Sequence, residues 1–276
     1  MEKWIDTHSH YDSRKINDND LIEKMFDTNE KIITLGTNTK CNLETLRLIS
    51  LHKDLYGMIG FFPNNAFELE KDFVGENKAK ENWTVFTKQL INQKIVGIGE
   101  IGLDGYHNNF GFGKNQIKGS KAIDYQVKYL KKQLNLAQEL DVPVSLHSRD
   151  AKEITKCVLD EYKEIKGVMH CFSYDLETAK YYLDKGLYIG VGGTSTYKNN
   201  TEVRNALKEV PLNRILLETD APYLTPDPFR RNTNDSSYIK YVIQSLAILK
   251  DISEEEIITQ TNKNAYDLFK FGKKGF

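Results

Sequence analysis

The chain has 276 residues, of which 38 are Lys or Arg and 39 are Asp or Glu, so its formal charge at pH 7 is −1. A chain of this length buries a large hydrophobic core and needs neither disulfides nor a structural metal to fold. The near-neutral charge argues against nucleic-acid binding over the whole surface, which requires a strongly basic domain, so any attraction to phosphate must be local.

The cysteines are isolated, odd in number and without a C-x-x-C pair: Cys41, Cys157 and Cys171. This usage is typical of a reducing compartment rather than of a disulfide framework. The first residues enter a strand-like segment directly, without the charged and apolar regions of a signal peptide. No apolar run approaches the length of a membrane span. We therefore expect a cytoplasmic monomer that does not associate with membranes.

Short apolar or β-branched segments alternate along the chain with amphipathic segments whose apolar residues are three and four positions apart. The strand-like segments are residues 4–8, 31–37, 55–61, 95–103, 143–147, 167–172, 187–192 and 215–219. The helix-like segments are residues 20–26, 42–51, 83–91, 125–140, 151–162, 176–185, 203–210 and 238–249. Eight alternations favour one α/β domain, residues 1–276, folded as a (β/α)8 TIM barrel. A doubly wound open sheet also fits the pattern.

Two features fall outside this repeat. Residues 253–260 and 264–271 predict extra C-terminal helices that complete the outer ring of the barrel. Residues 105–121 form a polar connection much longer than usual. This connection either covers a substrate or is a mobile insertion.

The first predicted strand carries His8 and His10, which flank Ser9, so both imidazoles emerge on one face of the strand. Two imidazoles on one face can chelate a metal, and the pair lies at the carboxyl end of the strand, where barrel enzymes build their active sites. Four further strands carry a histidine or a carboxylate at or near this end: Glu100, His147, His170 and Asp220. Each residue alone is more often structural, but together the six predict a metal centre.

The number of ligands indicates the number of metals. Six are more than one catalytic ion with open coordination positions takes, whereas two ions about 3.5–4 Å apart use them fully. Glu100 is the candidate bridging carboxylate. Imidazole and carboxylate ligands without thiolate fit Mg, Mn, Zn, Ni, Co or Fe and do not choose among them. Two ions balanced by Glu100 and Asp220 leave a local charge of about +2, which would attract a phosphodiester to this one cavity.

Two acids near the predicted ligands are candidates for orienting them. Asp6 lies two residues before His8, and Glu218 lies two residues before Asp220, so strand alternation places each acid below a ligand. The alternative is that each is an ordinary buried, hydrogen-bonded acid.

Other residues around the predicted site have simpler expected roles. Cys171 directly follows a predicted ligand and should face away from the site. Gly190 and Gly192 leave the inner face of the seventh strand bare, either to give room for a substrate or to allow close strand packing. The two remaining histidines, His52 and His107, are expected to be a surface residue at a helix end and a loop residue.

Five stretches of the chain carry a recognisable pattern: residues 6–10, 99–104, 143–150, 170–172 and 218–224. In this order, and over nearly the whole chain, they resemble the TatD family of metal-dependent deoxyribonucleases. The resemblance implies that the six residues above are metal ligands. It also implies hydrolysis of DNA phosphodiester bonds, in single strands or at a 3′ end, by a 3′-to-5′ exonuclease.

The chain departs from the family pattern at two places. The family commonly has Gly-x-His-Pro where this chain has Gly60-Phe61-Phe62-Pro63, so any substrate or metal contact of that histidine is lost at Phe62. The connection over residues 105–121 is also longer than is usual in the family, and the substrate preference could differ with it.

The expected mechanism is attack on phosphorus by a water that two metal ions activate. Asp220 is the candidate general base, because a carboxylate at the metal can accept the proton of the water. Arg149 could hold a phosphate oxygen, although an ion pair with a neighbouring acid is an equal alternative. Arg230 and Arg231 are weaker candidates for the same role.

Two other functions fit part of the pattern. An amidohydrolase acting on a small cyclic amide or lactone would use the same kind of metal centre, but Glu100 occupies the place where many such enzymes have a carboxylated lysine. A metal-stabilised binding or scaffold protein without turnover is the other alternative, and six ligands around an open mouth argue against it.

Overall fold

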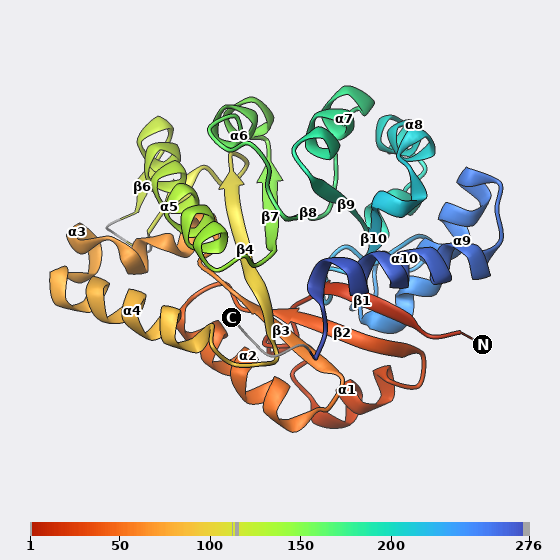
Figure 1. Ribbon diagram of the computed structural model, residues 1–276, viewed down its shortest axis with the longest axis horizontal. Helices are drawn as coiled ribbons and strands as arrows, with labels where there is room; N and C mark the ends of the chain where they lie inside the picture. Colours follow the sequence, from red (N-terminus) through yellow and green to blue (C-terminus); the bar gives the residue numbers. More distant parts are fainter. Residues whose placement is uncertain (1, 112, 114–115, 273–276) are drawn as a thin grey trace.

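The computed structural model describes residues 2–111, 113 and 116–272. Its main sheet has eight parallel strands in the order β1-β2-β3-β4-β7-β8-β9-β10. Their bounds are β1 Trp4–Ser9, β2 Asn29–Leu35, β3 Leu55–Ile59, β4 Ile95–Asp104, β7 Val144–Arg149, β8 Gly167–Met169, β9 Leu187–Val191 and β10 Ile215–Leu217. Every predicted strand is present, and together they curve into a nearly closed (β/α)8 barrel (Figure 1).

The barrel closes between β1 and the segment that follows β10. The backbone N–H of His10 donates to the carbonyl of Ala221 at 2.7 Å, and the N–H of Asp220 donates to the carbonyl of His8 at 2.8 Å. A parallel bridge joins Ser9 to Ala221. The first strand of the chain therefore meets the last, and the open doubly wound sheet is not formed.

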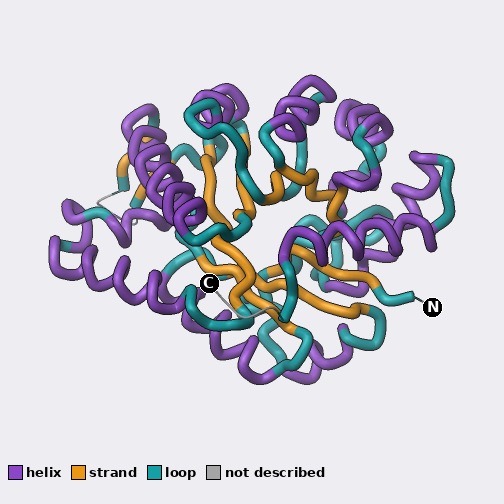
Figure 2. Tube along the Cα trace, in the orientation of Figure 1, coloured by secondary structure: helices purple, strands orange, loops and turns teal. Residues whose placement is uncertain are grey.

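Helices connect the strands and surround the barrel (Figure 2). Their bounds are α1 Asn19–Met25, α2 Thr39–Leu51, α3 Lys71–Val74, α4 Glu76–Gln89, α5 Ser120–Glu139, α6 Lys152–Leu159, α7 Leu176–Asp184, α8 Thr201–Glu209, α9 Ile239–Lys250 and α10 Glu254–Phe269. Capping side chains fix several helix starts. Asn38, Asp175 and Ser253 each accept a hydrogen bond from the backbone N–H three residues later, at the beginning of α2, α7 and α10.

The interior of the barrel is filled below the site by apolar side chains. One buried cluster combines residues from six of the strands with residues from α10: Ile5, Ile33, Leu35, Tyr56, Met58, Val96, Val168, Leu216, Ala265, Leu268 and Phe269. Because these strands lie around the barrel, their side chains meet only inside it. α10 therefore covers the amino-terminal end of the barrel, and the opposite end is left for chemistry.

The C-terminal region differs from the prediction, since α10 is one continuous helix where the sequence predicted two. Thr261 Oγ1 donates to the carbonyl of Ile257 at 2.7 Å, which satisfies the hydroxyl within the helix. No Gly or Pro lies in α10, so nothing in its sequence forces a break.

The long connection over residues 105–121 contains a short antiparallel pair, β5 Asn109–Phe110 with β6 Ile117–Lys118. The ring of Phe110 stacks on that of Tyr125 in α5, with centroids 4.8 Å apart. Both ends of the connection are thus anchored. The prediction of a substrate cover or a mobile insertion also included residues 112, 114 and 115. These three lie outside the described residues.

The prediction that His52 is a surface residue is wrong. His52 ends α2, but its side chain is buried and pairs with the carboxylate of Glu23 from α1. The helical pattern alone could not reveal this partner, because α1 covers the end of α2 only in the folded chain.

Candidate metal centre

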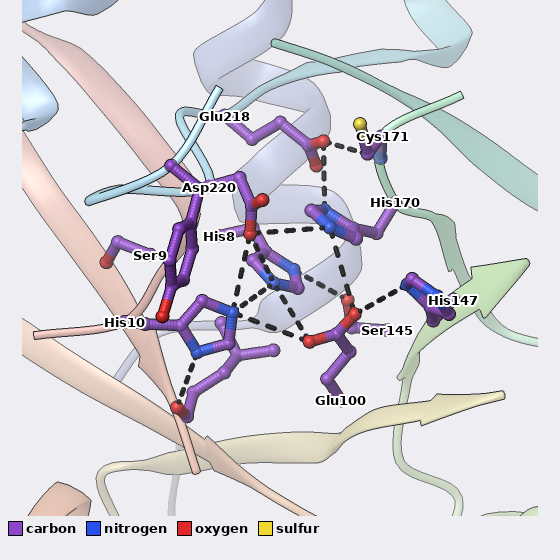
Figure 3. A network of polar contacts seen from close by, with 12 residues as sticks. His8, Ser9, His10, Glu100, Ser145, His147, His170, Cys171, Glu218 and Asp220 are labelled. Atoms are coloured by element: carbon purple, nitrogen blue, oxygen red, sulfur yellow. Dashed lines mark hydrogen bonds and ion pairs between the residues drawn. The ribbon is translucent and has the colours of Figure 1, made fainter. Parts of the chain in front are cut away.

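The structure brings all six predicted ligands together at the carboxyl end of the barrel (Figure 3). β1 ends beside His8 and His10, and Glu100 lies within β4. His147 lies in β7 and His170 directly follows β8, while Asp220 lies three residues beyond β10, in the segment that adjoins β1. Four of these residues are only 0–8 % exposed, and the side chain of Asp220 is 15 % exposed. The cluster is therefore largely shielded from water.

Two groups of three within the cluster could each hold a metal ion: His8 with Glu100 and His170, and His8 with His10 and Asp220. In each group the donor atoms all lie within 4.8 Å of one another. The Nε2 atoms of His8 and His10 are 3.2 Å apart, and Asp220 Oδ1 is 3.4 Å from His10 Nε2. Two ligands about 2.1 Å from one ion lie about 3.0–3.4 Å apart. The donor set therefore fits divalent metal.

His147 lies at the margin of the cluster. Its Nδ1 is 2.9 Å from Glu100 Oε1, while its Nε2 is 3.6 Å from a buried carboxylate oxygen of Asp104. His147 belongs to neither group of three. The contact with Asp104 was not predicted, although Asp104 ends the same strand that carries Glu100.

The Nδ1 atoms of His8 and His10, which point away from the centre of the cluster, have protein partners. His8 Nδ1 is 3.0 Å from Ser145 Oγ, and His10 Nδ1 is 3.1 Å from the carbonyl of Leu35. When Nδ1 carries the hydrogen and donates to such a partner, Nε2 presents its lone pair to the centre. Sequence reasoning missed Ser145, which lies two residues before His147 on the same face of β7 and could have been found by the strand alternation that indicated Glu218.

Glu218 lies where alternation placed it. Its Oε1 is 3.0 Å from Nδ1 of His170 and accepts a hydrogen bond from the backbone N–H of Cys171 at 2.6 Å. The carboxylate therefore reaches both the imidazole and the backbone that carries it. An acid in this position fixes the orientation of a ligating histidine.

Asp6 does not lie below His8 as alternation predicted, because the pairing of β1 with β2 is irregular between Asp6 and Ser9. Its carboxylate accepts hydrogen bonds from the hydroxyls of Thr219 at 2.7 Å and Ser236 at 2.6 Å, and from the backbone N–H of His8. Burial raises the pKa of Asp6 to about 7. Asp6 therefore joins β1 to the segment after β10. None of these hydrogen bonds is to the imidazole of a predicted ligand.

Gly190, in β9, makes room for a protein side chain rather than for substrate. A Cβ atom on Gly190 would lie 2.4 Å from Oε2 of Glu218, and one on Gly192 would lie 3.2 Å from the Glu218 carbonyl. The close-packing alternative thus holds at Gly190.

Cys171 lines the cavity above the donors, so the prediction that it faces away is wrong. That prediction assumed strand alternation, but β8 ends at Met169 and Cys171 has a φ of 46°. The turn redirects the side chain to within 3.9 Å of Thr194 Oγ1.

The cluster without metal holds both charged carboxylates and protonated imidazoles. Burial alone would raise the pKa of Glu100, but His10, His147 and His8 outweigh it and hold this pKa well below its usual value. Burial and the charge of His170 lower the pKa of His8 to about 4. His8 is therefore neutral at pH 7 and has a lone pair to offer.

The pKa values of the other three imidazoles, those of His10, His147 and His170, shift in the opposite direction. Burial alone would lower the pKa of His10, but Asp220 and Glu100 raise it well above its usual value. Asp104 and Glu100 likewise overcome burial and raise the pKa of His147 to about 9. Metal must therefore displace protons from His10 and His147.

A cavity of about 1430 Å³ opens above the cluster. Phe62, the residue in place of the family histidine, lines it, and its ring centroid is 4.7 Å from that of His147. His107, expected as a loop residue, also lines the cavity and lies 2.6 Å from Asp104 through Nδ1. Sequence patterns do not indicate this position of His107, because it depends on the path of the connection after β4.

The two candidate phosphate-binding arginines differ in position. Arg149 lines the cavity, with its guanidinium carbon 3.8 Å above the ring of Tyr106, and among the described residues it has no ion-pair partner. Arg230 stacks on Tyr197 at 3.9 Å and does not belong to the described cavity lining. Of the two arginines, only Arg149 therefore lies in the lining of the cavity above the cluster.

A family model described as TatD-related DNase matches residues 5–270. The chain belongs to this family. Among TatD-related proteins, it is 33% identical to the metal-dependent hydrolase YabD of Bacillus subtilis over 273 residues, which cover 96% of this chain and 98% of YabD. The fold and the metal-dependent hydrolase class predicted from the sequence are confirmed.

Other TatD relatives extend this comparison. The 3′-5′ ssDNA/RNA exonuclease TatD of Salmonella typhimurium is 28% identical over 260 residues, covering 91% of this chain and 92% of that protein. The crystal structure of YJJV, a TatD homologue from Escherichia coli, superposes with a TM-score of 0.80 at 30% identity, over 97% of this chain and 98% of YJJV. In the described part of this TatD-related chain, no helix is long and apolar enough to cross a membrane.

Proposed function

We propose that this TatD-related hydrolase removes nucleotides from the 3′ end of single-stranded nucleic acid. In this proposal two divalent ions are held by His8, His10, Glu100, His147, His170 and Asp220, with Glu100 bridging. The relative from Salmonella typhimurium, the 3′-5′ ssDNA/RNA exonuclease TatD, supports the choice of substrate.

The size of the cavity above the six donors carries the proposal. Pockets for small molecules usually measure about 300–1,000 Å³, whereas this cavity measures about 1430 Å³. A cyclic amide or lactone would fill only part of it. A polymer that enters at one end fits the available volume better.

Each residue has a defined task in the proposed reaction. The bound ions would lower the pKa of water and neutralise charge on the phosphate. As the water oxygen bonds to phosphorus and the bond from phosphorus to the leaving 3′ oxygen breaks, Asp220 would accept the proton that the water loses and return it to the leaving oxygen. Arg149, without a competing acid, donates to a non-bridging phosphate oxygen.

The deciding experiment compares substrates. Purified protein with Mg or Mn is incubated with 5′-labelled single-stranded DNA and RNA, and separately with a panel of hydantoins and lactones. We expect products that shorten stepwise from the 3′ end, and metal analysis that gives two ions per chain. Turnover of the small molecules without nucleolysis would support the amidohydrolase alternative. No turnover at all, with a lower melting temperature after metal removal, would support the scaffold alternative.

Substitution of Asp220 tests the assignment of the base. Asp220→Asn at saturating metal should lower kcat on single-stranded DNA by about 10²–10⁴-fold. Asp251→Asn is the matched control, since Asp251 is exposed at the end of α9, where its backbone conformation suits asparagine equally well. Equal kcat for both variants would remove Asp220 from its proposed role.

A further inference from the structure

The cavity extends away from the metal centre along one face of α2. Five of its lining residues belong to this helix, namely Cys41 and the four residues Lys40, Leu43, Glu44 and Arg47 that form its wall. Their spacing of three, four and seven positions places them on one face over two turns. Since an α-helix rises about 1.5 Å per residue, this wall is about 10 Å long. The cavity therefore reaches from the metal centre to this wall of α2.

The charges along this wall are predominantly positive. Arg14, in the loop between β1 and α1, joins Lys40 and Arg47 as a third cation in the lining. Glu44 is engaged by Arg47 at 2.7 Å, and the side chain of Asp12 is only 7% exposed. Within the described ranges, neither Arg14 nor Lys40 has an ion-pair partner. Two cations thus remain available for an anionic ligand.

Apolar side chains are exposed among these cations and beside the metal centre. Leu43, between Lys40 and Arg47 on α2, is 53% exposed. Tyr223 is 49% exposed, lines the cavity beside His10, and has one cation, Lys15, 5.5 Å from its ring centroid. Exposed apolar and aromatic groups interleaved with cations suit a strand whose bases are unstacked.

We propose that Arg14, Lys40, Leu43 and Arg47, here named the α2 arm, bind the backbone of a single-stranded nucleic acid beyond the nucleotide at the metal centre. This inference rests on the proposed function and adds to it the path of the strand. Along the axis of a duplex, successive phosphates of one strand are about 3.4 Å apart, which is a third of the length of this wall. A wall about 10 Å long therefore contacts more than one phosphate.

The α2 arm predicts that affinity depends on the length of the substrate. The KM of the wild-type protein should fall as oligothymidylate grows from two to eight nucleotides. Each cation that binds a single-stranded phosphate contributes a slope of about −0.7 to the logarithm of affinity against the logarithm of salt. Lowering the salt concentration from about 1 M to 0.1 M therefore raises the affinity about fivefold for each such cation.

Three double variants test the arm. Arg14→Ala with Lys40→Ala should raise the KM for the octamer about 25-fold and reduce the salt slope by about 1.4. Lys53→Ala with Lys180→Ala removes the same charge from exposed positions outside the cavity lining and should change neither. Arg14→Lys with Lys40→Arg keeps the charge and should recover most of the affinity, which guards against a simple folding defect.

Direct binding separates this inference from the proposed function. Fluorescence anisotropy of labelled octathymidylate, in EDTA, reports the arm without turnover, while hydrolysis of bis(p-nitrophenyl) phosphate by the wild type reports phosphodiester chemistry without the arm. An inactive wild type that still binds the octamer through Arg14 and Lys40 would refute only the proposed function. The arm is overturned if the alanine pair binds like the Lys53 and Lys180 control, or if a blunt duplex of equal length binds as tightly as the single strand.

Discussion

Ser145 Oγ lies 3.0 Å from Nδ1 of His8, so a hydroxyl on β7 orients an imidazole on β1 from the opposite side of the barrel. Ser145→Ala should lower metal affinity by about 10–100-fold, because the ring loses the partner that fixes its orientation. Calorimetric titration with Mn or Zn measures the change. Ser9→Ala is the control, since Ser9 Oγ donates to the carbonyl of Ile33 and not to an imidazole. Equal affinities would show that Ser145 does not orient His8.

Metal binding should release protons. In the metal-free protein the pKa of His10 is raised well above its usual value and that of His147 is raised to about 9, so both are protonated at pH 7. Ligands bind in the deprotonated form, so filling both sites should release about two protons per chain. Affinity should rise with pH up to about 9. Calorimetry at pH 7 in buffers of different ionisation enthalpy measures the number of protons released. If the same number were released above pH 10, the raised pKa values of these imidazoles would be contradicted.

Asp175 caps α7 and should stabilise the fold in a pH-dependent way. Its backbone and side-chain hydrogen bonds with Thr178 lower its pKa to about 2, below the value of 3.8 for an unperturbed aspartate. A depressed pKa in the folded state adds stability above pH 3.8 that is lost as the pH falls towards 2. Asp175→Ala should cost about 1 kcal/mol at pH 7 and less at pH 2.

The control for the cap is Asp175→Asn, which keeps an acceptor for the N–H of Thr178 but carries no charge. It also removes the ion pair with Lys152, at 3.1 Å, which is partly exposed and contributes little. Urea unfolding at several pH values should therefore give near wild-type stability at pH 7 and a flatter pH profile. A loss equal to that of alanine would mean that charge, rather than the cap, stabilises α7.

Gly190→Ala should disturb the metal centre from outside the donor set. The added methyl group would lie 2.4 Å from Glu218 Oε2, so the carboxylate that reaches His170 must move. We expect lower metal affinity together with a lower melting temperature. Gly192→Ala, whose methyl group meets the Glu218 backbone at 3.2 Å, should have a smaller effect on metal affinity. The reverse order of the two variants would contradict this account of Gly190.

The fold and the donor cluster follow from local patterns in the sequence. The strands that carry His8 and His147 are short and alternate with amphipathic helices, and in a parallel barrel their carboxyl ends must meet at one rim. The bulged Asp6 and the turned Cys171 were placed wrongly, because alternation holds only while a strand is regular. The burial of His52 depends on a partner from another helix, and sequence periodicity does not report such contacts.

The seam that closes the barrel has a consequence for biosynthesis. His8 and His10 are made well before Asp220, which lies 210 residues after His10 in the chain, and backbone hydrogen bonds join the two segments. A chain still growing on the ribosome contains the early imidazoles without their late carboxylate. The complete donor cluster therefore forms only after this seam has closed, and its presence marks a barrel that has been completed.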